Sequence, residues 1–292
     1  MKLIGHLNNM KKVLVTGANG QLGSEIKELA VHYSKFDFIF TDIADFPLDK
    51  EAEIVANFNQ IQPDIVINCA AYTAVDKAEQ DQETANAINH LAIKTLAQLC
   101  KETNAKLIHI STDYVFDGTS AIAYKEEDIP NPKSVYGVTK LAGEIACQRE
   151  CPDGIIIRTA WVYSEFGNNF VKTMLRLMTE RETLSVVNDQ VGSPTYAADL
   201  AQVILTILDN EKWEPGTYHY SNHGEISWFD FANDIKEIAN KSCEIIGIPA
   251  SNYPTPAERP AYSLLNKAKI KAVYDIDPVD YKISLKKMMA RL

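Results

Sequence analysis

The chain has 292 residues, of which 46% are hydrophobic and 23% charged, and its 39 acidic and 29 basic side chains leave a formal net charge of −10. This composition excludes disordered, collagen-like and low-complexity classes. An acidic chain in which no basic run exceeds two residues lacks the positive surface that nucleic acids and anionic membranes require. We therefore expect neither as a partner, and we expect any anionic ligand to be held by a few cations and by backbone donors.

Residues 1–10 are predicted to be an extension before the first strand. They contain neither the apolar core nor the cleavage site of a signal peptide, and no window of the chain reaches the roughly 18 apolar residues of a membrane span. The cysteines are odd in number and form no C-x-x-C pair, which favours neither a disulfide framework nor a zinc site. We interpret them as reduced thiols of a cytoplasmic protein.

Residues 11–163 alternate short β-branched runs with helical patterns, which is typical of a parallel sheet covered on both faces. Strands are predicted over 12–16, 36–41, 64–68, 106–111 and 154–159. Helices are predicted over 21–34, 84–102 and 134–149. The expected fold is α/β, a Rossmann-like doubly wound parallel sheet.

After Trp161 the alternation of β-branched runs and helical patterns ends. Helices are predicted over 168–181, 196–208 and 228–239, an LSVV segment lies at 184–187, a strand is expected at 217–220, and a proline-punctuated loop at 248–260. We expect residues 164–292 to form mainly a smaller substrate-binding lobe, with parts of 184–221 completing the sheet. A ligand would then bind between the two lobes.

A glycine turn joins the first predicted strand to the first helix. Gly17, Gly20 and Gly23 follow the G-x-x-G-x-x-G spacing, in the context that a dinucleotide fingerprint requires. Glycines allow a tight turn and a close approach of the backbone to a pyrophosphate. The alternative is a strand-to-helix turn that is merely glycine-rich.

Acidic side chains follow the second strand. Asp42 lies 19 residues after Gly23, where a carboxylate can bind the adenosine ribose 2′-hydroxyl and would repel a 2′-phosphate. Asp42 therefore favours NADH over NADPH, unless it only ends the strand. Asp49 lies near the expected adenine position, and the small residues after Asn68 would let a cofactor cross the carboxyl end of the third strand.

Tyr136 and Lys140 are spaced i and i+4 on one face of the helix after the fourth strand, and Thr112 ends that strand. A lysine ammonium beside a phenol is expected to lower its pKa toward neutrality, so that the tyrosine can exchange a proton with a carbonyl. Thr112 can hydrogen-bond the same substrate oxygen. The alternative is an exposed pair on a solvated helix face.

The segments TGANGQLG, STDYVFDG and YGVTK together resemble the extended short-chain dehydrogenase/reductases, and among them the family of dTDP-4-dehydrorhamnose reductases. Further similar segments cover nearly the whole chain in order: AAYTAVDKAE, RTAWVY, GNNFVKTMLRL, NDQVGSPT and PTPAERPAYSLL. Thr112 is followed by Asp113 and Tyr114, not by the Asp-Glu pair of the related dehydratases, so elimination of water is not expected.

The resemblance implies an NADH- or NADPH-dependent reduction of the C4 ketone of dTDP-4-dehydro-β-L-rhamnose to dTDP-L-rhamnose. It implies catalytic roles for Tyr136, Lys140 and Thr112. The implied cofactor-binding residues are Gly17, Gly20, Gln21, Leu22, Gly23, Asp42, Asp49, Ala70, Ala71, Tyr72, Thr73, Tyr136 and Lys140. The implied sugar-nucleotide-binding residues are Thr73, Val75, Thr112, Tyr114, Trp161, Asn169 and Arg259.

Three alternatives stay open: another sugar-nucleotide reductase, an epimerase of the same superfamily, and a non-catalytic subunit like the regulatory subunit of methionine adenosyltransferase. A monomer or a homodimer is expected. Some members of the family bind magnesium through acidic residues, but the sequence does not indicate such a site, and no histidine has metal-ligand spacing.

Six arginines limit the choice of partners for a substrate diphosphate. Arg158 interrupts an apolar strand and is predicted to form a buried structural pair. Arg259, in a loop, is the better candidate, followed by Lys172 and Arg176. Without the resemblance, Trp161 could equally be a core residue.

Overall fold

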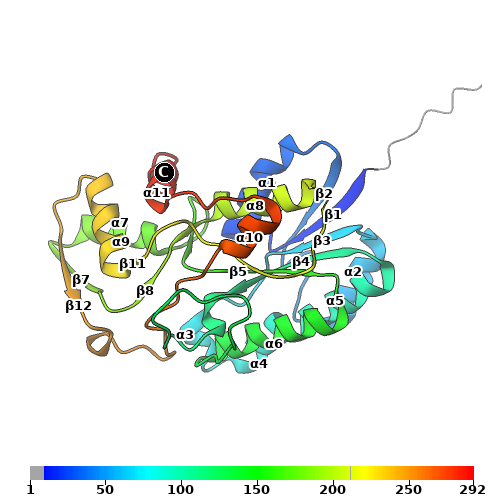
Figure 1. The fold of residues 1–292 in the computed structure, drawn as a ribbon, viewed down its shortest axis with the longest axis horizontal. Helices are drawn as coiled ribbons and strands as arrows, with labels where there is room; N and C mark the ends of the chain where they lie inside the picture. Colours follow the sequence, from blue (N-terminus) through cyan, green and yellow to red (C-terminus); the bar gives the residue numbers. More distant parts are fainter. Residues whose placement is uncertain (1–9, 211) are drawn as a thin grey trace, which may run out of the picture.

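The computed structural model describes residues 10–210 and 212–292, and its centre is a six-stranded parallel sheet (Figure 1). The strand order is β10-β5-β4-β3-β1-β2. The strands are β1 (Lys11–Thr16), β2 (Phe36–Thr41), β3 (Ile65–Asn68), β4 (Lys106–Thr112), β5 (Ile155–Thr159) and β10 (Gly216–His219). The order reverses at β1, which pairs with β2 on one side and β3 on the other, and ligands bind at such a switch point.

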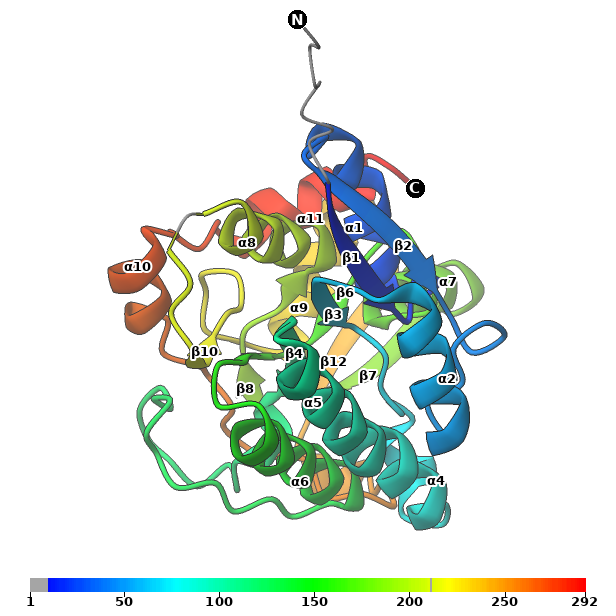
Figure 2. The ribbon, with the colours of Figure 1, turned by 90° about the vertical axis from the view of Figure 1, so that its right-hand side faces the viewer.

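Helices cover both faces of this sheet (Figures 1 and 2). One face carries α1 (Gln21–Leu29), α8 (Ala197–Asp209) and α10 (Ala268–Tyr274), and the other carries α2 (Glu51–Ile61), α5 (Ala92–Thr103) and α6 (Val135–Glu150). A hydrophobic core lies on each face of the sheet. Alternate residues of β1 pack into one core or the other, because side chains of a strand point to opposite faces. Val13 and Val15 pack with Ile26 of α1, while Leu14 packs with Phe58 of α2.

The helical region after β3 differs from the single helix predicted over 84–102. It contains α3 (Val75–Ala78), α4 (Gln82–Asn86), a π-helical turn (Ala87–Leu91) and α5. The Asn89 side chain in the π turn accepts a hydrogen bond from the Tyr72 backbone N–H at 2.8 Å and donates to Thr139 Oγ1 at 3.2 Å. These contacts hold the π turn against the loop after β3 and against α6.

Two other helices also differ from expectation. The first helix, predicted over 21–34, ends at Leu29 and continues as a 3₁₀ turn (Ala30–His32). Helix α2 has no counterpart among the predicted elements. Only Ile54 and Phe58 of its residues are fully buried, so the sequence carries a weak apolar pattern there.

The smaller lobe is built from the second half of the chain. Its elements are β6 (Val162–Tyr163), α7 (Phe170–Glu180), β7 (Thr183–Val187), β8 (Val191–Gly192), β9 (Thr195–Tyr196), β11 (Ile226–Ser227), α9 (Trp228–Ile238), β12 (Glu244–Ile248) and α11 (Tyr281–Met289). Strands β7 and β12 pair in parallel, and Phe231, Met174 and Leu285 lie in the core of this lobe. The remaining 3₁₀ turns are Asp113–Val115 and Ala250–Asn252.

Part of the second half nevertheless belongs to the large sheet. β10 pairs with β5, and α8 packs on the same face as α1, with Leu200 and Ile204 in that core. Of the predicted N-terminal extension, residues 1–9 lie outside the described residues, and Met10 is exposed. Within the described ranges, no helix is long and apolar enough to cross a bilayer.

Candidate active site

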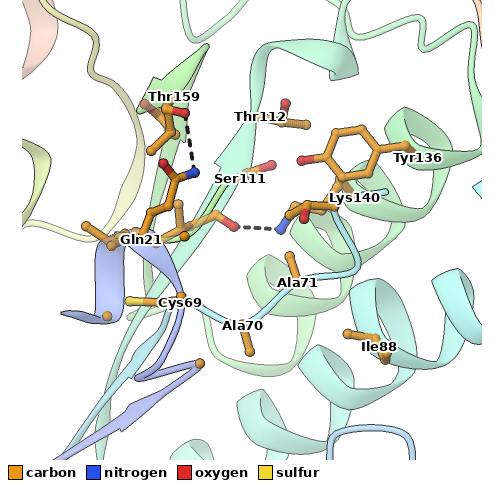
Figure 3. A pocket seen from close by; sticks show the side chains of 18 of the residues that line it. Gln21, Cys69, Ala70, Ala71, Ile88, Ser111, Thr112, Tyr136, Lys140 and Thr159 are labelled. Atoms are coloured by element: carbon orange, nitrogen blue, oxygen red, sulfur yellow. Dashed lines mark hydrogen bonds between the residues drawn. The ribbon is translucent and has the colours of Figure 1, made fainter. Parts of the chain in front are cut away.

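A cleft of about 650 Å³ opens at the carboxyl edge of the large sheet. Its walls come from the turn between β1 and α1, the loop after β3, the end of β4, helix α6 and the segment 160–168 (Figure 3). Both lobes therefore contribute to the cleft, at the place where the strand order reverses.

The glycine turn forms one end of the cleft and is shaped for close backbone approach. Gly17 has φ +68°, and a Cβ there would lie 2.8 Å from the Ala70 Cα, so the turn after β1 touches the loop after β3. A Cβ on Gly23 would lie 2.3 Å from the Gly17 oxygen. Gly20 is the N-cap of α1 and contributes no side chain, so the N–H groups of the first turn are accessible to an anion.

Asp42 and Asp49 line the same end of the cleft. The Asp42 carboxylate accepts hydrogen bonds from the Asn19 N–H at 2.7 Å and the Ile43 N–H at 2.8 Å, which fix its position after β2. Among the described residues that line the cleft, Lys140 is the only lysine or arginine. A 2′-phosphate would therefore meet a carboxylate here and no cationic side chain.

Tyr136, Lys140 and Thr112 meet in the middle of the cleft, where the Tyr136 hydroxyl points toward Thr112 (Figure 3). Ser134 caps α6 by accepting a hydrogen bond from the Gly137 N–H at 3.1 Å. A Cβ on Gly137 would lie 2.3 Å from the Tyr114 oxygen, so glycine is needed for α6 to approach the end of β4. All three predicted catalytic residues are buried.

The pKa of Tyr136 does not follow the expectation of a lysine-lowered phenol, which is wrong for this structure. Burial raises the pKa of Tyr136 to about 12, although a hydrogen bond with Thr112 opposes this shift. The Lys140 ammonium donates instead to the Ile110 carbonyl at 2.6 Å. Burial also lowers the pKa of Lys140 to about 8, against the opposing charge of Glu144.

Asp113 and Ser111 are cleft residues that the sequence analysis did not select. Asp113 Oδ1 accepts a hydrogen bond from Thr112 Oγ1 at 3.0 Å, and Asp113 Oδ2 is buried without a hydrogen-bond partner in the described part of the chain. Burial raises the pKa of Asp113 to about 6. The sequence could have indicated Asp113 by its position between Thr112 and Tyr114, directly after a buried strand.

Thr73, Val75, Tyr114 and Trp161 line the other end of the cleft, together with Gly167 and Asn168, which were not predicted. The Tyr114 ring packs edge-on against Tyr136, with ring centroids 5.4 Å apart. This part of the cleft combines aromatic and small polar side chains.

Three predicted site residues have side chains that do not line the cleft. The Tyr72 hydroxyl donates to Asp81 at 3.0 Å. Asn169 caps α7 and donates to Gln21 Oε1 at 3.0 Å. Arg259 forms an ion pair with Asp76 at 2.7 Å, beside the loop that carries Thr73 and Val75.

The remaining cations considered for a diphosphate have partners within the chain. Arg158 pairs with Glu144 at 2.7 Å with both side chains buried, which confirms its structural role. Lys172 donates to the Gly167 carbonyl at 2.8 Å, and Arg176 pairs with Glu180 at 2.9 Å on the surface.

Three carboxylates converge away from the catalytic centre. Oxygens of Glu25, Glu28 and Glu165 lie within 4.8 Å of one another. The Arg291 guanidinium lies among them, 2.5 Å from Glu165 and 3.9 Å from Glu25, and is also paired with Glu28. The cation that these carboxylates contact is thus Arg291, and the cluster does not fit a magnesium ion as it stands.

A dinucleotide cradle at the switch point of a parallel sheet, next to a buried tyrosine and lysine on one helix face, is the arrangement of the extended short-chain dehydrogenase/reductases. Comparison with known sequences narrows this class. The family described as RmlD substrate binding domain matches residues 10–292, and the chain belongs to this family.

Individual relatives are similar to this chain over nearly its full length. A protein named dTDP-4-dehydrorhamnose reductase from Aggregatibacter actinomycetemcomitans is 38% identical, covering 96% of this chain and 99% of the relative. A crystal structure of a dTDP-4-dehydrorhamnose reductase from Clostridium acetobutylicum is 40% identical, with a TM-score of 0.92 over 96% of this chain and 99% of that one. A Bacillus anthracis enzyme of the same name, solved in complex with NADP, is 36% identical, with a TM-score of 0.92 over 97% and 99%.

Proposed function

We propose that this protein reduces the C4 ketone of dTDP-4-dehydro-β-L-rhamnose to dTDP-L-rhamnose with NADH or NADPH. The observation that carries the proposal is the buried set of Tyr136, Lys140 and Thr112, which share one cleft in a chain similar from end to end to enzymes named dTDP-4-dehydrorhamnose reductase. The five free thiols fit a reducing compartment, and we place the enzyme in the cytoplasm.

The residues present fit a dinucleotide cofactor. The backbone at Gly20, Gln21 and Leu22 would hold the pyrophosphate, because Gly17 and Gly23 allow the tight turn and Gly20 leaves the first N–H groups of α1 uncovered by a side chain. Ala70 and Ala71 are small enough to let the cofactor cross the end of β3, and Lys140 would bind the nicotinamide ribose. The cofactor supplies a hydride to the C4 carbon when bound.

Tyr136 is the general acid in this proposal. A pKa of about 12 keeps its hydroxyl protonated at neutral pH, as a proton donor to the C4 oxygen must be. Thr112, toward which the phenol points, orients that oxygen by a hydrogen bond. The Lys140 ammonium, which donates to the Ile110 carbonyl, keeps a cationic group in the same buried cleft as Tyr136.

Thr73, Val75, Tyr114 and Trp161 form the sugar subsite in our proposal, since they line the same cleft as Tyr136. Asn169 and Arg259 would contact the nucleotide diphosphate only after exchanging their present partners, Gln21 and Asp76. Arg259 is half-buried beside α3, which begins at the cleft residue Val75 and carries Asp76.

The direct test follows the absorbance of NADH or NADPH when the protein meets dTDP-4-dehydrorhamnose. We expect net oxidation of the cofactor, whereas an epimerase would leave the cofactor level unchanged and a non-catalytic subunit would show no turnover. Tyr136→Phe should lower kcat by about 10²–10⁴ while cofactor binding persists. Absence of oxidation with either cofactor contradicts the proposal, and retained activity in Tyr136→Phe contradicts the assigned acid.

We further propose that the enzyme prefers NADH. The Asp42 carboxylate would repel a 2′-phosphate on the adenosine ribose, and the only lysine or arginine among the described cleft residues, Lys140, donates to the Ile110 carbonyl instead. Asp42→Asn keeps an oxygen for the Asn19 N–H but removes the charge. It should raise the kcat/KM for NADPH relative to NADH by about tenfold, or ~1.4 kcal/mol.

The matched control for this change is Asp45→Asn, which removes a charge from the same loop, at a residue that does not line the cleft. The control should leave the cofactor ratio unchanged. An unchanged ratio in Asp42→Asn, or an equal shift in both variants, would contradict the role of Asp42.

A further inference from the structure

Trp161 has an unusual backbone for a bulky residue. Its φ is +50°, in the left-handed region that is strained for a non-glycine residue. The other non-glycine residues described with positive φ all follow the end of a helix, where this conformation is common: Gln62, Asn104, Asn240 and Asp275. Trp161 instead follows β5 and lines the cleft, so its strain coincides with the sugar end of the site.

The Trp161 ring is held from the smaller lobe. It stacks on Trp228, with ring centroids 3.6 Å apart and planes inclined by 11°. Trp228 is the first residue of α9, and Ser227 and Asp230 form a capping box that fixes this helix end. The Trp161 carbonyl also accepts a hydrogen bond from the Thr195 N–H at 3.2 Å.

Two further contacts define the position of the stacked pair. A Cβ on Gly192 would lie 3.0 Å from two atoms of the Trp161 indole, so the ring packs directly against the backbone of β8. Phe170 supports the far ring, with its centroid 4.6 Å from that of Trp228. Gly192, Phe170 and Trp228 all come from the second half of the chain, and none of them lines the cleft.

We propose that Trp228 is a positioning residue for sugar recognition: it holds Trp161 in its strained conformation as an aromatic wall of the sugar subsite. The inference rests on the proposed function. An indole face suits the apolar C–H face of a deoxyhexose, and a ring already held in place spares the ligand the entropy of ordering it. Without the stack, Trp161 relaxes toward an ordinary backbone conformation and the wall is lost.

The test compares Trp228→Leu, Trp228→Phe and the control Trp213→Phe, each in the full chain. Trp213 is the one remaining tryptophan of the sequence; it donates to the Asp153 carbonyl at 2.8 Å and does not line the cleft. We expect Trp228→Leu to raise the KM for dTDP-4-dehydrorhamnose about tenfold and leave the KM for the cofactor within about twofold, with partial recovery in Trp228→Phe. Trp213→Phe should match the wild type.

Circular dichroism supplies a readout that is independent of turnover. Two indoles stacked this closely should give an exciton couplet, which should disappear in Trp228→Leu and persist in Trp213→Phe. Unchanged sugar KM in Trp228→Leu, with wild-type activity present and the couplet lost, overturns the proposal alone. A wild-type protein that does not turn over the dTDP-sugar overturns the proposed function and this inference with it. If Trp228→Leu does not fold, the test uses Trp228→Phe, and its KM for the dTDP-sugar is compared with its KM for the cofactor in the same way.

Discussion

Asp113 is buried directly behind Thr112 and has no cationic partner among the described residues. The negative charge of the Asp113 carboxylate therefore acts on the nearby hydroxyls of Thr112 and Tyr136. It contributes to the high pKa of Tyr136. Hydrogen bonds connect the Asp113 carboxylate to Thr112 and Thr112 to Tyr136. The protonation state of Asp113 can therefore affect both catalytic hydroxyls.

Replacing Asp113 by asparagine should change the pH profile of the reaction. The pKa of Asp113 is raised from 3.8 to about 6 because burial disfavours its charge, so the carboxylate gains a proton as the pH falls through about 6. It then no longer accepts strongly from Thr112. We expect kcat/KM of the wild type to fall below pH 6 and that of Asp113→Asn to stay flat between about pH 5 and 7. The same inflection in both proteins would exclude Asp113 as its source.

Individual site residues differed in how well the sequence predicted them. The i and i+4 spacing of Tyr136 and Lys140 is visible in the chain because it needs only a helix. Their burial, which sets both pKa values, depends on how α6 packs on β4 and has no local signal. The ion pair of Arg259 with Asp76 joins residues far apart in the sequence, so the present position of that guanidinium could not be predicted.

At the scale of elements, the contact between α6 and the π turn fixes the catalytic helix. A Cβ on Gly143 would lie 2.1 Å from the Asn89 oxygen, so the two helical segments touch through backbone. The Asn89 side chain bridges the same contact by donating to Thr139 Oγ1 at 3.2 Å. Helix α6 is thus held close to the loop that carries Ala70–Thr73.

Gly143→Ala should displace α6 from this contact. Overpacking costs about 1–3 kcal/mol of unfolding free energy, and kcat should fall because Tyr136 and Lys140 move with the helix. Urea denaturation and steady-state kinetics would measure both effects. Ile145→Ala, at an exposed position of the same helix, should change the unfolding free energy by no more than about 0.5 kcal/mol. Equal stability of Gly143→Ala and the wild type would contradict the close contact.

The elements themselves were predictable where a single pattern dominated. The inner strands β3 and β5 are runs of β-branched residues buried on both faces, and the predicted bounds of all six strands of the large sheet lie within a residue of those observed. The π turn was not predictable, because it depends on Asn89 meeting Tyr72 and Thr139 from other elements. Helix α2 was not predicted, although Ile54 and Phe58 lie in the core and Val55 and Ile61 pack against it.

At the scale of the molecule, Arg291 links the last segment of the chain to the first helix of the cofactor site. It pairs with Glu25 and Glu28 of α1 and with Glu165, which precedes the cleft residues Gly167 and Asn168. Glu25 is buried and accepts a hydrogen bond from Ser164 at 2.7 Å. Burial, opposed by this bond, raises its pKa from 4.5 to about 8.

This shift gives the folding stability a pH dependence with a definite sign. The folded protein binds the Glu25 proton more tightly than the unfolded chain does. The resulting stabilisation is complete below pH 4.5 and is lost as the pH rises through about 8. Glu25→Gln should abolish this loss, whose slope is at most about 1.4 kcal/mol per pH unit. Denaturation at pH 5.5 and 8 would measure it, with Glu28→Gln as a control that keeps the Glu25 carboxyl.

The place of β10 in the large sheet bears on how the protein is made. Its neighbour β5 is entirely buried, yet β10 is synthesised only after β6, α7, β7 and α8. At about 5–20 residues per second, the Ile155–Ile157 edge of a nascent chain stays unpaired for several seconds on the ribosome. An apolar strand edge of this kind is prone to pairing with other chains. The order of synthesis therefore leaves this edge of the large sheet exposed until β10 has emerged.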